Sequence, residues 1–239
     1  MPPLELSDSD AAEVLARGEL EVLGRMPWAS NATLLAVARA DGVEMQAIYK
    51  PRRGERPLWD FPSGTLCQRE VATYELSDAL GWGLVPPTVL RDGPVGIGMV
   101  QRFVDHDPEE HYFTLLEEHA DRFLQFAVFD VLVNNADRKG GHCIRKSDGT
   151  IVGIDHGLTF HPAWKLRTVI WDFAGDAVPP ALADDVCRVL VDDELGERME
   201  PLVSSLEMDA MQQRARELVG TGRLPDPDPG YHSLPWPLV

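Results

Sequence analysis

Residues 134–144, NNADRKGGHCI, hold the side chains that are best suited to chemistry. Asp137 carries a carboxylate that could accept a proton, and His142 could bind a metal ion or donate a hydrogen bond. A second stretch, IDHG at 154–157, adds the carboxylate of Asp155. Carboxylates are the usual protein ligands of Mg²⁺, whereas imidazole suits Mn²⁺ or Zn²⁺ better. These residue types, placed beside basic side chains, are typical of a site that holds a metal-bound phosphate.

A hairpin between the two stretches would bring these side chains together. The Asp-Gly pair at 148–149 is a strong signal for a tight two-residue turn. With that pair at the centre of the turn, Ser147 faces Thr150 and His142 faces Asp155. Directly opposed residues share one face of the ladder, with Cβ atoms roughly 4.5–5.5 Å apart. Because a slip of one residue would turn the two side chains to opposite faces, this register is a definite prediction.

The charge of the chain restricts its partners. The 239 residues carry a formal net charge of -17, which argues against non-specific binding to nucleic acid or to an anionic membrane. Basic side chains nevertheless cluster in KPRRGER at 50–56 and in RKGGHCIRK at 138–146. Each cation alone could belong to a solvated turn. Two such clusters in an acidic chain favour a bound polyanion such as a nucleotide phosphate.

The same composition predicts a cytoplasmic globular protein. No run of about 18 apolar residues is present, so we expect no membrane span. The N-terminal stretch lacks the basic and then apolar pattern of a signal peptide. Cys67, Cys143 and Cys187 have neither metal-type nor disulfide-type spacing, which fits a reducing compartment.

The first hundred residues are predicted to form strands and turns around one helix. Residues 33–50 have Asp-Gly at 41–42 between two apolar runs, which predicts a hairpin with Lys50 at the end of its second strand. Residues 65–83 have helical spacing and end in glycines. Residues 85–104 predict a second strand pair, joined around Asp92-Gly93.

The rest of the chain is predicted to be mainly helical. Residues 121–135 are apolar on nearly all sides, as expected for a helix in the centre of a lobe. Residues 181–219 predict two or three amphipathic helices, the last ended by Gly220. Residues from 224 onwards contain five prolines and should be extended, either docked or loose. A strand-rich first part and a helical second part predict an α+β fold with two lobes.

Together these motifs resemble the phosphatidylinositol 3- and 4-kinase-like branch of the protein-kinase-like superfold. DRKGGH at 137–142 and IDHG at 154–157 are similar to its catalytic loop, D-R-x-x-x-N, and its metal motif, I-D-x-G. AIYKP at 47–51 resembles the strand with the phosphate-binding lysine, and CQREVATYE at 67–75 the helix with its ion-pair partner. The resemblance implies an antiparallel-sheet N-lobe at 1–103, a mainly helical C-lobe at 104–223 and a Pro-rich tail at 224–239.

The resemblance also implies a role for each residue. Lys50 would bind the α- and β-phosphates and pair with Glu70, with Glu75 as a competitor on the same helix. Asp137 would orient the attacking hydroxyl or accept its proton, and Asp155 would hold the metal. GMVQRFV at 98–104 resembles the last N-lobe strand running into the adenine-binding hinge. The nucleotide-binding residues expected on this basis are Lys50, Ser30, Asn31, Thr33, Gln101, Arg102 and Phe103.

Two features depart from the family pattern. No glycine-rich loop precedes the lysine, and PWASNAT at 27–33 is either its substitute or a plain polar turn. His142 stands where the family has a metal-holding Asn. It could bind a softer metal, contact a phosphate, or mark a lost second metal site.

The function expected from these features is an ATP-dependent phosphotransferase that uses Mg²⁺ or Mn²⁺ and acts on a hydroxyl of a small molecule or a protein. The acceptor has no recognisable motif, although Arg138 and Lys139 could steer an anionic one. A lipid is disfavoured by the net charge and the lack of a basic amphipathic helix. The alternatives are a nucleotide-binding pseudokinase acting as a regulator or scaffold, a nucleotidyl transferase, and a metallohydrolase. The last would use His142, Asp155, His156 and His161.

Overall fold

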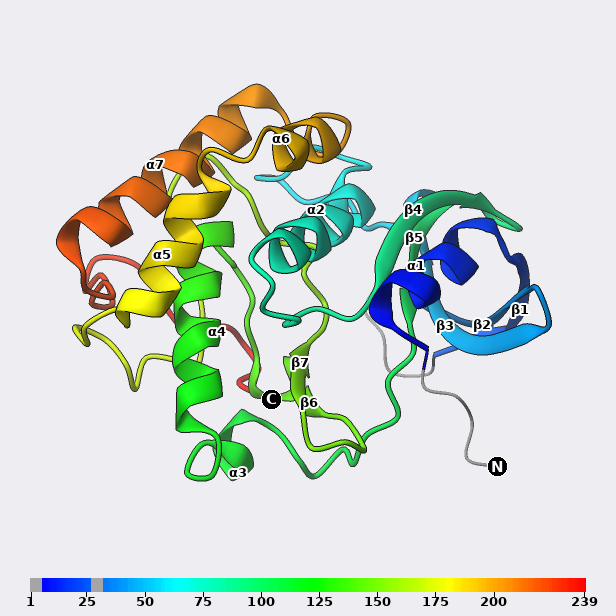
Figure 1. Cartoon of the computed structure of the whole chain (residues 1–239), viewed down its shortest axis with the longest axis horizontal. Coiled ribbons are helices and arrows are strands. Elements are labelled where there is room, and N and C mark those ends of the chain that lie inside the picture. The colour runs from blue at the N-terminus through cyan, green and yellow to red at the C-terminus, as the bar shows by residue number, and fades with distance from the viewer. Residues whose placement is uncertain (1–5, 27–31) are drawn as a thin grey trace.

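A computed structural model describes residues 6–26 and 32–239 and places an antiparallel sheet beside a mainly helical body (Figure 1). The predicted α+β class is confirmed. The five strands of the sheet lie in the order β1-β2-β3-β5-β4. Their bounds are β1 Glu19–Arg25, β2 Leu34–Ala40, β3 Val43–Pro51, β4 Thr88–Gly93 and β5 Gly96–Arg102. Within the described residues, no helix combines the length and apolar character that a membrane crossing needs.

The turns of the sheet largely follow the sequence signals. Asp41 and Gly42 join β2 to β3, and both have positive φ, 52° and 78°, as the predicted two-residue turn requires. In the second hairpin Gly93 pairs with Gly96, so the turn lies at Pro94 and Val95, just beyond the predicted Asp92-Gly93.

One face of the sheet is covered by α1 (Asp8–Arg17), a helix that the sequence reasoning missed. Its apolar Leu15 packs with Tyr49 and Val100 in a core of its own. Because neighbouring residues of a strand point to opposite faces, Lys50 on β3 is turned away from this core and toward the helical body.

The helical body is built around α4 (Ala120–Val133), which is buried along most of its length as predicted. The last helix continues through Gly220 and ends at Thr221, because Gly222 takes the left-handed cap with φ 64°. The other helices are α2 Leu66–Ala79, α3 Tyr112–Leu115, α5 Pro180–Val189, α6 Asp193–Met199 and α7 Ser205–Thr221, with short 3₁₀ turns at Arg52–Gly54 and Gly140–His142.

The hairpin β6 (Cys143–Arg145) and β7 (Ile151–Gly153) has a different register from the predicted one. Cys143 faces Gly153, and the Lys146 N–H donates to the Thr150 carbonyl at 2.8 Å. The turn therefore contains three residues, 147–149, with the left-handed conformation at Gly149. The predicted register was wrong by one residue, because glycine at the third position of a longer turn gives the same sequence signal as a two-residue turn.

Residues 224–239 are docked on the helical body, and the C-terminal end lies beside β6 and β7 (Figure 1). The Ser233 carbonyl accepts hydrogen bonds from the Thr168 N–H at 3.1 Å and from Trp171 Nε1 at 3.0 Å. The division into lobes at residue 103 stays a prediction.

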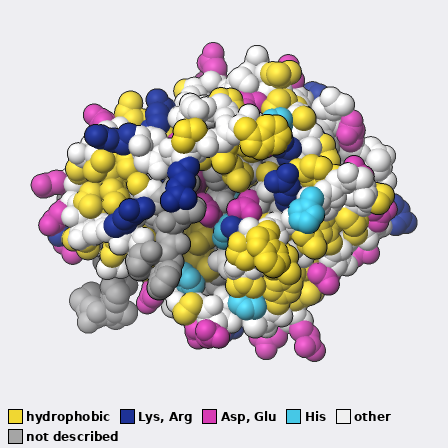
Figure 2. Space-filling view, turned by 180° about the vertical axis from the view of Figure 1, so that it is seen from behind, with side chains coloured by type: hydrophobic (Ala, Val, Ile, Leu, Met, Phe, Trp, Pro, Cys, Tyr) yellow, Lys and Arg dark blue, Asp and Glu magenta, His cyan; other side chains and the backbone are white. Residues whose placement is uncertain are grey.

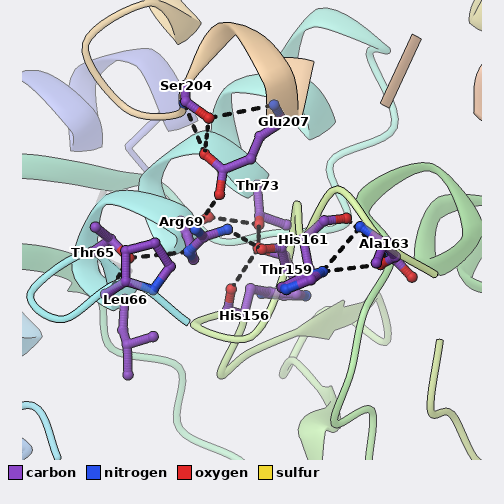
Figure 3. A network of polar contacts seen from close by, with 12 residues as sticks. Thr65, Leu66, Arg69, Thr73, His156, Thr159, His161, Ala163, Ser204 and Glu207 are labelled. Atoms are coloured by element: carbon purple, nitrogen blue, oxygen red, sulfur yellow. Dashed lines mark hydrogen bonds and ion pairs between the residues drawn. The ribbon is translucent and has the colours of Figure 1, made fainter. Parts of the chain in front are cut away.

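A buried arginine joins α2 to the helical body (Figure 3). Arg69 is 1% exposed and forms an ion pair with Glu207 of α7. It also donates to the Thr159 carbonyl at 2.5 Å and to Thr65 Oγ1 at 3.2 Å. Glu207 in turn accepts from the Ser204 N–H at 2.8 Å in the capping box of α7. Because Glu70 follows Arg69 on α2, this network fixes the helix that carries Glu70.

We predict that Arg69→Met lowers the free energy of unfolding by about 3–5 kcal/mol, because it leaves the Glu207 carboxylate buried without its partner. Urea unfolding measures the change. Arg17→Met is the matched control, since its ion pair with Glu13 is exposed and its loss should stay within about 0.5 kcal/mol. Equal losses in the two variants would show that the Arg69 pair does not hold α2.

Candidate active site

Lys50 lies between two carboxylates from distant parts of the chain. Its Nζ is 2.7 Å from Glu70 Oε1 on α2 and 2.8 Å from Asp155 Oδ1 after β7. Burial alone would lower the pKa of Lys50, but Asp155 and Glu70 outweigh that effect and raise it. The ammonium is therefore charged at neutral pH, in the position where it could also meet an anionic ligand.

Glu70 is the acidic partner on α2, and Glu75 is not. Glu70 is 3% exposed, and burial raises its pKa while Lys50 opposes the rise. The Glu75 carboxylate pairs instead with Arg198 of α6 at 2.8 Å. The partner of Lys50 is therefore Glu70 and not Glu75, because the two carboxylates lie on different faces of α2.

Asp155 and His142 converge, although not through the predicted register. Asp155 Oδ2 lies 3.5 Å from His142 Nε2. His142 is in a 3₁₀ turn, its carbonyl accepts from the Ile154 N–H at 2.9 Å, and Asp155 has a left-handed backbone with φ 60°. The strand has already ended at Gly153, so this backbone conformation, rather than ladder pairing, brings the two side chains together.

The electrostatics of this pair fit a divalent cation. Burial lowers the pKa of His142 to about 4 in spite of the Asp155 charge, so the imidazole is neutral and keeps a lone pair. Lys50 holds the pKa of Asp155 well below its usual range, so the carboxylate stays ionised. An anionic oxygen beside a neutral imidazole nitrogen is a pair of donors that suits Mn²⁺. Mg²⁺ would use the carboxylate oxygen alone.

Asp137 lies close enough to Asp155 for the two charges to interact. Its carboxylate pairs with Lys139 Nζ at 3.1 Å. Burial raises the pKa of Asp137, Lys139 opposes this, and the nearby charge of Asp155 adds to the rise. A carboxylate with a raised pKa is a better proton acceptor at neutral pH.

Sequence reasoning missed the residue that holds Asp137 in place. Asn135 Oδ1 accepts the Asp137 N–H at 3.0 Å, and the Asn135 amide donates to Asp130 at 3.1 Å. The polar pair Asn134-Asn135 at the end of an apolar helix was the available signal.

Arg138 does not steer an acceptor. It is fully buried, pairs with Asp130 at 2.8 Å, and contacts His156 Nε2 at 2.8 Å. His161 interacts with the Ala163 backbone. Neither histidine joins His142 and Asp155, and the described residues contain no group of three or more His, Cys, Asp or Glu arranged to hold a metal. The arrangement gives no support to the metallohydrolase reading.

The other residues expected to bind nucleotide are placed as follows. Ser30 and Asn31 lie outside the described residues. Thr33 is 8% exposed, and its carbonyl accepts the Met26 N–H at 2.9 Å across the β1–β2 loop.

The three residues of the predicted hinge have polar groups that are already engaged. Gln101 donates to Thr88 Oγ1 at 2.8 Å. Arg102 turns toward α1, 3.6 Å from Asp8. The Phe103 N–H donates to the carbonyl of Gln46 at 3.0 Å. Their part in nucleotide binding stays a prediction.

Figure 2 shows a hollow on one face of the molecule, with acidic side chains inside it and Lys and Arg side chains around it. Such a surface suits a polyanion bound through cations at the rim and a metal at the carboxylates. The order of the motifs, the sheet topology and the Lys50–Glu70 pair together point to one family.

The sequence pattern of the family described as phosphatidylinositol 3- and 4-kinase matches residues 91–214, just over half of the chain. The chain belongs to the phosphatidylinositol 3- and 4-kinase family. Protein Rv2133c of Mycobacterium tuberculosis is 40% identical to it over 271 aligned positions, covering 98% of this chain and 97% of the relative.

The crystal structure of the Helicobacter pylori proinflammatory kinase CtkA is similar with a TM-score of 0.54, over 88% of this chain and 94% of that one. At 12% identity this likeness shows the fold alone. The family and the fold support a kinase-like phosphotransferase.

We predict that Lys50→Met raises the pKa of Asp155, because the Lys50 charge is the main cause of its depression and burial opposes it. Carbon-detected NMR titration of the Asp side chains measures this. Lys146→Met is the control: it should raise the pKa of Asp148 from about 2 and leave that of Asp155 unchanged. A pKa of Asp155 that does not move in Lys50→Met would contradict the assignment.

Proposed function

We propose that this family member is an ATP- and metal-dependent kinase that transfers the γ-phosphoryl group to a hydroxyl. The observation that carries the proposal is the position of Lys50, within 2.8 Å of both Glu70 and Asp155. A lysine held by a helix carboxylate, next to the metal-binding carboxylate, is the arrangement by which kinases position nucleotide phosphates.

In this proposal the ammonium of Lys50 contacts the α- and β-phosphates and is oriented by Glu70. The family generally uses ATP with Mg²⁺, and here Asp155 and His142 would hold the cation, which would neutralise phosphate charge. Phosphoryl transfer depends mainly on positioning and charge neutralisation, so few protein groups are needed.

Asp137 is proposed as the residue that acts on the acceptor. The acceptor oxygen bonds to the γ-phosphorus, the bond from that phosphorus to ADP breaks, and ADP leaves with the electron pair. The hydroxyl proton passes to the Asp137 carboxylate, whose raised pKa favours this step. Lys139, 3.1 Å away, keeps the carboxylate oriented.

We place the protein in the cytoplasm and expect its partners to be a nucleotide and a small-molecule or protein acceptor. The free state of Cys67, Cys143 and Cys187 supports a reducing compartment.

A nucleotide-binding pseudokinase is the second candidate, and His142 in place of the family's Asn favours it. Turnover separates the two proposals, because a pseudokinase binds nucleotide without consuming it. Release of ADP from ATP in the presence of Mg²⁺ or Mn²⁺ supports the kinase.

We predict that Asp155→Asn and Asp137→Asn separate binding from turnover. Ligand at 100 times its Kd stabilises a protein by about 2.7 kcal/mol, which thermal unfolding detects. Asp155→Asn should lose the shift that requires ATP and metal together, whereas Asp137→Asn should keep it and lose phosphoryl transfer. A shift unchanged in Asp155→Asn would remove this residue from metal binding, and full activity of Asp137→Asn would remove its catalytic role.

His142→Asn should move the metal preference from Mn²⁺ toward Mg²⁺, because it replaces a nitrogen donor by an oxygen donor. The ratio of the ATP-dependent shifts with the two metals is the readout. His161→Asn is the control, since the His161 ring interacts with the Ala163 backbone and the Phe61 ring, away from Asp155. An unaltered ratio in His142→Asn would return His142 to a hydrogen-bonding role.

A further inference from the structure

Arg167 lies beside the loop that carries the proposed catalytic carboxylate, bonded through its main chain to Asn135 and Arg138. Its charge is one of those that oppose the burial-raised pKa of Asp137, after that of Lys139. Its guanidinium stacks on the ring of Tyr231, with Cζ 5.1 Å from the ring centre. Within residues 6–26 and 32–239 it forms no ion pair, and its buried Nε has no hydrogen-bond partner. The residue as a whole is only partly buried.

The backbone around Arg167 is fixed to the catalytic loop. The Arg167 N–H donates to the Asn135 carbonyl at 2.8 Å, and the Arg167 carbonyl accepts from the Arg138 N–H at 2.9 Å. These bonds lie on both sides of Asp137 in the sequence. The backbone of Arg167 is therefore held against the loop that carries Asp137 by main-chain hydrogen bonds.

Residues 231–239 hold the stacking partner in place. The Leu238 carbonyl accepts the N–H of Gly140 in the catalytic loop at 2.7 Å, and the Ser233 carbonyl accepts that of Thr168 at 3.1 Å. A Cβ at Gly140 would lie 3.0 Å from the Phe113 ring and 3.3 Å from the Leu238 carbonyl, so a larger residue there would crowd the tail. The tail thus contacts both the catalytic loop and the segment that carries Arg167.

The Asp137 carboxylate already pairs with Lys139, and no ion pair joins Arg167 to a carboxylate within residues 6–26 and 32–239. Holding a partly desolvated cation without a counter-charge is unfavourable. A planar guanidinium binds carboxylate or phosphate oxygens through two parallel hydrogen bonds.

We propose that Arg167 binds an anionic group, a carboxylate or a phosphate, on a small alcohol whose hydroxyl lies at Asp137, and that Tyr231 is the positioning residue that holds the guanidinium. This rests on the proposed kinase function and names the substrate class of the same site. The Pro-rich tail is then a wall of the acceptor site.

The test uses the full chain, labelled ATP and the better of Mg²⁺ and Mn²⁺, with acceptors in matched pairs. The pairs are glycerol with glycerol 3-phosphate, glycerol with glycerate, and myo-inositol with inositol 1-phosphate. Vesicles that contain phosphatidylinositol are tested as a separate acceptor, and an acidic peptide with a serine is tested as another. We expect transfer to a soluble anionic member with a kcat/KM at least about 10-fold above that of its neutral partner.

The variants locate the effect. Arg167→Met should raise the KM of the anionic acceptor by about 10- to 100-fold, while the KM for ATP and the kcat change little. Tyr231→Phe keeps the ring and should behave as wild type, whereas Tyr231→Ala should raise the acceptor KM. Arg216→Met on α7, where the exposed Arg216 donates to Gln212 Oε1 at 3.0 Å, is the control.

A probe that needs no turnover is inorganic phosphate, which should stabilise the wild type against heat more than Arg167→Met. Equal use of neutral and anionic alcohols, transfer to the peptide alone, or a phosphate shift that survives Arg167→Met overturns the proposal. Absence of both transfer and a phosphate shift also overturns it. Transfer to the vesicles alone, lost in Arg167→Met, assigns the anionic group to a lipid headgroup. If the wild type is not stabilised against heat by ATP and metal together, the kinase function itself is refuted.

Discussion

The ammonium of Lys50 is the contact on which the geometry of the site depends. Its two partners, Glu70 and Asp155, come from a helix and from a turn 85 positions apart in the sequence. A charge taken out of water is tolerated only while its partner stays in place, because an uncompensated buried charge costs about 3–5 kcal/mol. The sheet, α2 and the β6–β7 hairpin therefore have to meet at Lys50. Other buried ion pairs, such as that of Arg69 with Glu207, hold these elements in place.

Much of the site could be predicted because its signals are local. The turn at Asp41-Gly42 fixes which residues of β3 face the helices, and with them the side of the sheet on which Lys50 lies. Asp137 and Asp155 lie near each other, as the spacing of the two motifs predicts, because only a short hairpin separates them. His142 meets Asp155 for a reason that differs from the predicted one, since the left-handed turn at Asp155 replaces ladder pairing.

What the sequence could not show depends on contacts between distant segments. Arg138 is a charged residue in a polar loop and is therefore expected to be exposed. Only the fold reveals that it contacts Asp130 and His156 in the interior. The prolines of the tail predict an extended chain but not the surface on which it lies. Helix α1 has only three buried residues and packs on one face of the sheet rather than in the helical core, so its sequence pattern is weak.

Arg69 and Glu70 are neighbours on α2, yet they point in different directions: Arg69 to Glu207 of α7 and Glu70 to Lys50 of the sheet. Successive helix residues are separated by about 100° around the axis, so one turn of helix serves both contacts. A rotation of α2 that withdrew Glu70 from Lys50 would also drag Arg69 away from Glu207 and Thr159. The first turns of the helix are thus anchored on two sides, and any motion that opens the catalytic side also loosens the contact with α7.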